Sequence, residues 1–281
     1  MIRPGGFSVL PDVVKNLIII NVLLFLATIA TANFGFDLRN TLGLHMPGSE
    51  AFRPYQLITY MFMHGSFGHI FFNMFAVWMF GSSIENVWGP KRFLIFYLLT
   101  GIGAAALHYG ILYFEMLPDL QLMDAYIANP SIGNLNMLIE SFRFSGNLID
   151  EAGLRADFNE FKVAYDTLLL YPSDSSSLSF TSNFMANYKE VYLSAPNVVG
   201  ASGSLFGILL AFGMLFPNTP LFLIFFPIPI KAKYFVIGYG LIELFSGLQN
   251  NPGDNVAHFA HLGGMLFGFI LIKFWKSRGI Y

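Results

Sequence analysis

Six stretches of this chain are apolar over lengths that approach the thickness of a lipid bilayer, and no other feature constrains its fold as strongly. A helix needs about 20 mostly apolar residues to cross the hydrocarbon core. The six runs are 17–34, 69–87, 93–114, 200–216, 234–248 and 256–275. Charged residues make up 11% of the chain, whereas soluble domains carry about 25%. We therefore predict an all-α, polytopic membrane protein with six transmembrane helices in contact with the lipid bilayer.

Composition also excludes several classes of function. The net charge is −2 and Lys and Arg number 15, so the chain lacks the basic surface that nucleic-acid binding requires. It contains no Cys, which rules out disulfides, thiolate metal sites and a cysteine nucleophile. We expect no nucleic-acid partner.

The basic residues of the short connecting segments predict the orientation of the chain. Apart from Arg39 and Arg53, which lie between the first and second runs, they lie before the first run, between the second and third, between the fourth and fifth, and from the end of the sixth onward: Arg3, Lys15, Lys91, Arg92, Lys231, Lys233, Lys273, Lys276 and Arg278. With six spans these four segments share one side of the membrane, and positively charged loops favour the cytoplasmic side. Both termini are therefore expected in the cytoplasm.

A long segment interrupts the membrane pattern and divides the chain into 1–114, 115–199 and 200–281. The middle part holds 11 Asp and Glu against 4 Lys and Arg, and the predicted topology makes it extracytoplasmic. Apolar residues recur in it at helical spacing, which predicts a helical insertion between the third and fourth transmembrane helices. Its Ser-rich run 173–182 is interpreted as a flexible surface loop. The run 221–230, broken by two prolines, is interpreted as a loop at the membrane interface.

The fourth run begins with a serine among small residues, in the motif Gly200-Ala201-Ser202-Gly203. Small neighbours let a second backbone or a substrate approach the Ser202 hydroxyl. The N–H of Ser202, in the first helical turn, is also a donor that could hold an oxyanion. Taken alone, however, the motif favours helix packing, for which Gly203 and Gly207, four residues apart, suffice.

A serine nucleophile needs a base, and the sixth run offers His258 and His261. His261, Gly264 and Gly268 share one helix face, so the glycines would let this helix press against the fourth and bring the imidazole toward Ser202. His258 lies one turn earlier on nearly the same face. Spacing alone leaves the base open between the two histidines.

The second run supplies His69 and Asn73, which are four residues apart and can direct hydrogen-bond donors at one point. An imidazole N–H and a carboxamide suit a developing oxyanion. The alternative is that these side chains bond each other or backbone carbonyls. His64 lies just before them, while His45 and His108 are interpreted as structural histidines.

Together these motifs resemble the rhomboid family of intramembrane serine proteases. Residues 64–73 are similar to that family's His-x4-His-x3-Asn, residues 200–203 to its Gly-x-Ser-Gly, and residues 261–268 to its His-x2-Gly-x3-Gly. Phe52-Arg53 resembles its Trp-Arg loop signature, with Phe in place of Trp. The resemblance covers roughly the whole chain outside the insertion.

This resemblance implies a six-helix rhomboid-like bundle that cleaves transmembrane segments of other membrane proteins. It implies a dyad of Ser202 and His261, because the family's histidine precedes the glycine pair, and an oxyanion site formed by His69 and Asn73. His64 is expected to support the first loop and the cavity. No cofactor and no metal are expected, and the expected location is the bacterial inner membrane.

The resemblance also implies that no carboxylate completes a triad, so Asp254 and Asn255 are not expected to take part. Two other classes remain open on the sequence. A non-catalytic rhomboid-like protein would bind membrane proteins without cleaving them, and a metal or haem protein would use the same histidines as ligands. The presence of both Ser202 and His261 favours the enzyme over the non-catalytic binder.

Overall fold

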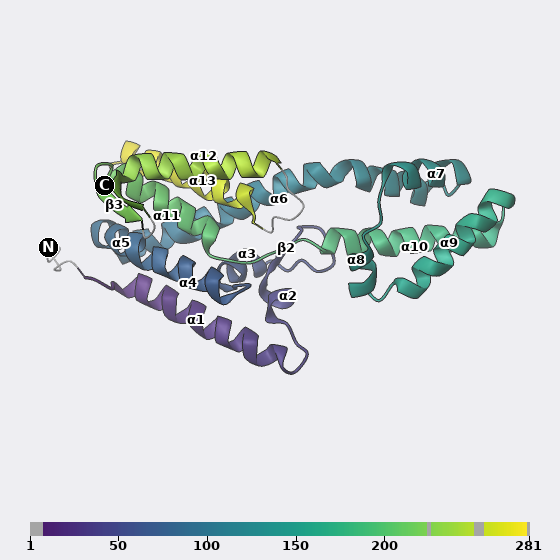
Figure 1. Cartoon of the computed structure of the whole chain (residues 1–281), viewed down its shortest axis with the longest axis horizontal. Helices are drawn as coiled ribbons and strands as arrows, with labels where there is room; N and C mark the ends of the chain where they lie inside the picture. The colour runs from purple at the N-terminus through teal and green to yellow at the C-terminus, as the bar shows by residue number, and fades with distance from the viewer. Residues whose placement is uncertain (1–7, 224–225, 250–255, 280–281) are drawn as a thin grey trace. The chain divides into compact units, whose positions relative to one another are not determined.

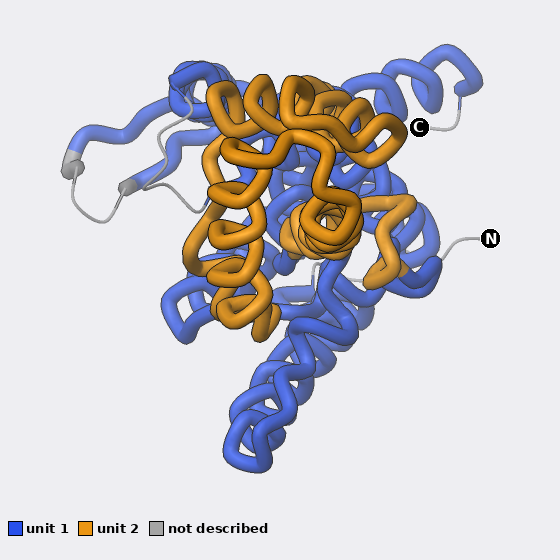
Figure 2. The backbone as a smooth tube through the Cα atoms, turned by 90° about the vertical axis from the view of Figure 1, so that its right-hand side faces the viewer, with its two compact units in different colours: residues 1–44, 53–110, 198–281 blue, residues 45–52, 111–197 orange. Residues whose placement is uncertain are grey.

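The chain is mostly helical, and the computed structural model describes residues 8–223, 226–249 and 256–279 (Figure 1). It divides into two compact units, which Figure 2 distinguishes by colour. The first unit comprises Met1–Leu44, Arg53–Gly110 and Val198–Tyr281. The second comprises His45–Phe52 and Ile111–Asn197.

The first unit contains most of the apolar helices. Its described elements are α1 (Asp12–Ala32), α2 (Leu38–Leu42), α3 (Gln56–Thr59), the 3₁₀ segment η1 (Tyr60–Phe62), α4 (Phe67–Ala76), the π-helical segment η2 (Val77–Gly81), α5 (Ser82–Trp88), the first part of α6 (Pro90–Ala128), α11 (Ser202–Leu215), β3 (Pro220–Leu223), β4 (Phe226–Lys231), α12 (Ala232–Gln249) and α13 (His258–Ser277).

The second unit is helical. Its described elements are the rest of α6, α7 (Ile132–Ser141), α8 (Gly146–Glu151), α9 (Arg155–Leu170) and α10 (Ser175–Ser194). The two-residue strands β1 (Leu44–His45) and β2 (Asn197–Val198) each contain one of the boundaries between the units.

Four of the described helices are long and apolar enough to cross a membrane: α1, the continuous helix Phe67–Trp88, α6 and α13. Their outer faces carry exposed apolar side chains such as Leu23 of α1 and Phe72 of α4, as lipid contact requires. α11 is apolar but has 14 residues, and α12 has 18. These helices support an integral membrane protein, while the count of six spans stays a prediction.

Glycines set the spacing of α6, α11 and α13. A Cβ at Gly264 of α13 would lie 1.8 Å from the backbone oxygen of Gly203 of α11, and one at Gly268 would lie 3.3 Å from the Cα of Gly207. On the side of α6, a Cβ at Gly203 would lie 2.5 Å from that of Ala104. The helix backbones therefore touch, as the glycine spacing predicts, and small residues are what permit such close crossings.

A buried carboxylate holds the beginning of α1. Pro11, at the N-cap of α1, supplies no side-chain hydrogen bond. Instead Glu85 of α5 accepts hydrogen bonds from the N–H groups of Val13 and Val14, at 3.0 and 2.8 Å. A negative charge is favourable at a helix N-terminus, where backbone donors are unpaired. The start of α1 is thereby fixed to the end of the Phe67–Trp88 helix.

The second unit is built around an aromatic core. Phe161 of α9 and Phe184 of α10 are buried with ring centroids 4.8 Å apart, beside Tyr188. The helical periodicity expected before residue 170 is present as α9. The interpretation of 173–182 as a surface loop is wrong, because Asp174 caps α10 by accepting a hydrogen bond from the Ser177 N–H at 2.8 Å. Helix α10 then continues into the aromatic core.

The third predicted span is longer than expected, since α6 continues past residue 114 to Ala128. Met116, Leu120 and Met123 are buried at helical spacing, so this extension has an apolar face within the second unit. The run 221–230 also differs from expectation. It belongs to an antiparallel hairpin in which Pro220 pairs with Lys231 and Leu221 with Ile230.

Candidate active site

Ser202 is the first residue of α11, and the residues before it have a backbone that requires glycine. Gly200 has a φ of +128°, which side chains rarely tolerate, and its N–H donates to the backbone oxygen of Tyr60 at 2.9 Å. Ala201, the N-cap residue, provides no side-chain cap for the helix. The N–H groups of the first turn are therefore not used by such a cap.

The imidazole of His69 packs against Gly200. A Cβ at Gly200 would lie 2.8 Å from both Cε1 and Nε2 of His69, and 3.8 Å from the Oγ of Ser202. The missing side chain thus leaves space that the His69 ring approaches, next to the Ser202 hydroxyl. Ser66 caps α4 by accepting a hydrogen bond from the His69 N–H at 3.2 Å, which fixes the start of the helix that carries this ring.

Asn73 lies one turn after His69 and contacts His64. Its amide Nδ2 donates to Nε2 of His64 at 3.1 Å, and Asn73 is buried. The rings of His64 and His69 meet edge to face, with centroids 4.9 Å apart. Asn73 therefore pairs with His64 and not with a backbone carbonyl. The second hydrogen of its amide group remains for another acceptor.

His261 lies on the face of α13 that packs on α11. Its ring stacks on Phe206 with centroids 4.2 Å apart and an interplanar angle of 10°. Phe206 is one turn after Ser202 on α11, and Gly264, one turn after His261, touches Gly203. The imidazole of His261 is thus held against the first turns of α11, while only 8% of the residue is exposed.

A carboxylate from α12 contacts both histidines of α13. Oε2 of Glu243 lies 2.8 Å from Nδ1 of His261 and 2.6 Å from Nδ1 of His258. Sequence reasoning did not select Glu243, although an ionisable residue inside an apolar run is by default a candidate functional residue. Asp254 and Asn255, the acidic and amide residues considered from the sequence, lie outside the described residues.

Glu243, His258 and His261 form a group that could hold a metal ion, since one ligand atom from each lies within 4.8 Å of the others. Nitrogen and carboxylate ligands of this kind suit zinc, which in catalytic sites takes three protein ligands. His64 and His69, which the sequence left as possible ligands, are not part of this group. His45 has a structural contact, with Nδ1 2.8 Å from the backbone oxygen of Ser194.

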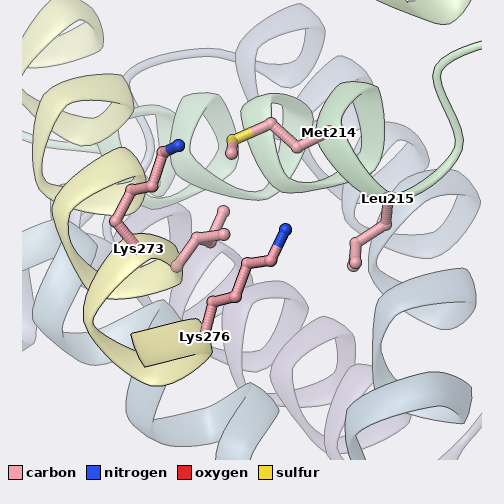
Figure 3. A pocket seen from close by; sticks show the side chains of 5 residues that line it. Met214, Leu215, Lys273 and Lys276 are labelled. Carbon is pink, nitrogen blue, oxygen red and sulfur yellow. The ribbon is translucent and has the colours of Figure 1, made fainter. Parts of the chain in front are cut away.

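A separate pocket of about 360 Å³ lies at the far end of α11 from Ser202 (Figure 3). Met214 and Leu215 line it from the end of α11, and Lys273 and Lys276 line it from α13. The helix rise of about 1.5 Å per residue places Met214 on the order of 18 Å along α11 from Ser202. This pocket therefore contains none of the candidate catalytic residues.

Comparison with known proteins agrees with the resemblance inferred from the sequence motifs. The family model described as the Rhomboid domain matches residues 51–120 and 168–277, more than half of the chain. An uncharacterized mitochondrial rhomboid protein of Schizosaccharomyces pombe is 37% identical over 93 residues, which cover 31% of this chain and 24% of that protein. The rhomboid protease GluP of Bacillus subtilis is 38% identical over 48 residues, 17% of this chain and 10% of that protein. The chain thus spans a quarter or less of the relatives it matches.

Proposed function

This chain belongs to the rhomboid family, and on that premise we propose that it is an intramembrane serine endopeptidase that cleaves transmembrane segments of other membrane proteins. The observation that carries the proposal is the convergence of α4 and α13 on the start of α11. His69 packs against Gly200 beside the Ser202 hydroxyl, and His261 stacks one turn further along α11. A nucleophile, a base and an oxyanion donor are the groups that acyl transfer needs.

In the proposed mechanism, the imidazole of His261 removes the proton of the Ser202 hydroxyl, and the oxygen attacks the scissile carbonyl. The N–H of Ser202 and the side chains of His69 and Asn73 donate to the oxyanion. His261 then protonates the leaving amine, and water hydrolyses the acyl-enzyme with the same base. Removal of one oxyanion donor in such a site lowers the rate by about 10²–10³.

The base is His261 and not His258 in this proposal. Both rings contact Glu243, but the ring of His261 is the one that stacks on Phe206 of the nucleophile's helix. The position of His261 in the family motif, just before the glycine pair, independently favours the same residue. The distribution of Lys and Arg supports cytoplasmic termini, and we propose the bacterial inner membrane as the location.

The test is cleavage of a transmembrane substrate in detergent or liposomes by the wild type and by three variants. Ser202→Ala and His261→Ala should abolish cleavage, while His258→Ala should retain a substantial part of it. Thermal unfolding of each variant shows whether the fold persists. Equal loss of activity in folded His258→Ala and His261→Ala proteins would contradict the assignment of the base.

Two other functions make different predictions for the same material. A non-catalytic binder would not react with a fluorophosphonate at Ser202, whereas an active serine nucleophile would be labelled. A metalloprotein using Glu243, His258 and His261, the group whose ligand atoms lie within 4.8 Å of one another, would contain about one equivalent of metal after purification. Metal content measured by mass spectrometry separates this function from the protease.

A further inference from the structure

We propose that Glu243 is a positioning residue for His261, so that the catalytic group is a Ser202–His261–Glu243 triad and not a dyad. The inference rests on the proposed function and adds a third member to its site. It starts from the contact between Oε2 of Glu243 and Nδ1 of His261 at 2.8 Å. Both side chains are buried, with Glu243 5% exposed, so water does not compete strongly for this contact.

The burial of Glu243 is selective. Its neighbours on α12, Ile242 and Leu244, are exposed on the outer face of the helix, whereas Glu243 points toward α13. A carboxylate inside an apolar helix is unfavourable unless partners satisfy it. The two Nδ1 atoms of His258 and His261 provide those partners.

Glycines bring α12 close enough to α13 for this contact. A Cβ at Gly240 would lie 3.2 Å from the Cε of Met265, and one at Gly247 would lie 3.2 Å from the Cβ of His258. Gly240 and Gly247 are three residues before and four residues after Glu243, so all three share one helix face. The carboxylate is therefore directed at α13 by helix packing and is not placed there by a freely rotating side chain. Figure 1 shows α12 and α13 lying side by side.

The chemical consequence concerns the tautomer of His261. An ionised carboxylate only accepts hydrogen bonds, so Nδ1 of His261 carries its hydrogen toward Glu243. The neutral ring then has its lone pair on Nε2, the nitrogen that can accept the proton of the Ser202 hydroxyl. When Nε2 has taken that proton, the carboxylate stabilises the imidazolium. Glu243 itself stays ionised throughout, and the proton moves only between Ser202, His261 and the leaving amine.

His258 has a different part in this arrangement. Its Nδ1 donates to the same oxygen of Glu243 at 2.6 Å, which fixes the carboxylate from the other side. If His258 is replaced by Ala, the carboxylate keeps its contact with His261. This explains why the two histidines, one turn apart on α13, are expected to differ in their effect on activity.

The experiment compares Glu243→Gln, Glu243→Asp and Glu85→Gln with the wild type. Glu243→Gln should lower kcat for a transmembrane substrate, and the labelling rate of Ser202, by about 10² or more, with KM changed much less. Glu243→Asp keeps the charge and should recover part of that loss. Glu85 is also a buried carboxylate of the first unit but caps α1, so Glu85→Gln controls for lost stability and should keep kcat at temperatures where it is folded.

A second readout does not depend on activity. In protein labelled with ¹⁵N-histidine, the nitrogen shifts of His261, identified by their loss in His261→Ala, report which ring nitrogen carries the hydrogen. The wild type should have the Nδ1–H form, and Glu243→Gln should change the tautomer population. A wild type without protease activity but with this Glu243-dependent tautomer would refute the proposed function and leave the positioning role standing.

Three results would overturn the positioning role. One is wild-type kcat and labelling in Glu243→Gln. Another is a loss in Glu243→Gln that Glu85→Gln reproduces at matched thermal stability. The third is about one equivalent of metal in the purified wild type that Glu243→Gln removes, because the carboxylate would then be a metal ligand.

Discussion

The close contact between Gly264 and Gly203 means that one added methyl group, in Gly264→Ala, tests how α13 positions His261. In Gly264→Ala the added Cβ would lie 1.8 Å from the backbone oxygen of Gly203, whereas ordinary van der Waals contacts are 3.4–4 Å. The opposing atom is backbone, so no side-chain rotation relieves the overlap. The helices must separate by on the order of 1.5 Å at this crossing.

The size of the effect follows from two opposing contributions. Overpacking of this kind costs about 1–3 kcal/mol or more in unfolding free energy. Replacing glycine by alanine within a helix contributes about 1 kcal/mol in the other direction. Gly238 of α12 is the matched control, because a Cβ there would meet nothing within 4 Å. Both variants gain the helix-propensity contribution, so it cancels between them, and we expect Gly264→Ala to be about 1–3 kcal/mol less stable than Gly238→Ala.

The rate of the reaction at Ser202 should also fall, by more than the loss of folded protein explains. His261 is one turn before Gly264, so separation of α13 from α11 moves its ring away from Phe206 and Ser202. A displacement of about 1 Å can cost 10² in rate. The assay is thermal unfolding in detergent together with the rate of fluorophosphonate labelling, measured where both variants are folded. If Gly264→Ala and Gly238→Ala unfold at the same temperature and are labelled at the same rate, close packing of α13 on α11 does not position His261.

Three further predictions concern other parts of the chain. Replacing Glu85 by Ala should lower the unfolding free energy by about 1–3 kcal/mol, because two backbone donors of α1 lose their acceptor, and calorimetry in detergent would detect it. Asn73→Ala should reduce kcat by about 10²–10³ through loss of an oxyanion donor, and a comparable loss in His64→Ala would show that the pairing of these two side chains matters. Replacing most of the insertion 115–199 by a Gly/Ser linker should preserve fluorophosphonate labelling of Ser202. It should change the relative cleavage rates of substrates that differ in their extracytoplasmic flanks. Identical relative rates in both forms would show that the insertion has no role in substrate access.

The sequence predicted the parts of this structure that depend on local patterns. The glycines at 264 and 268 recur on one helix face, and the structure places that face on α11. Long apolar runs identified α1, α6 and α13 because hydropathy is a property of neighbouring residues. Family membership could also be inferred, since three short motifs occur in the expected order.

Other features depend on contacts that no local pattern contains. Glu243 lies 15 residues before His258 and on another helix, so its partners become visible only when α12 and α13 are packed. The Ser-rich run 173–182 has low apolar content at its start, but Asp174 caps the helix that begins there, and later residues of that helix, such as Phe184, are buried in the core. The prolines at 227 and 229 suggested a loop, whereas the structure places them in β4, which pairs with β3 in a sheet of two described strands, where a missing N–H is tolerated.

The attachment of α1 to Glu85 has a consequence for how the protein is made. The N–H groups of Val13 and Val14 find their acceptor 72 and 71 residues later in the chain, in α5. Chains are synthesised from the N-terminus, so α1 leaves the ribosome well before its cap exists. Its first turn must stay hydrated at the membrane surface until the end of the Phe67–Trp88 helix, which carries Glu85, has been made. The start of α1 can therefore dock only after the end of the Phe67–Trp88 helix has been made, although α1 precedes that helix in the chain.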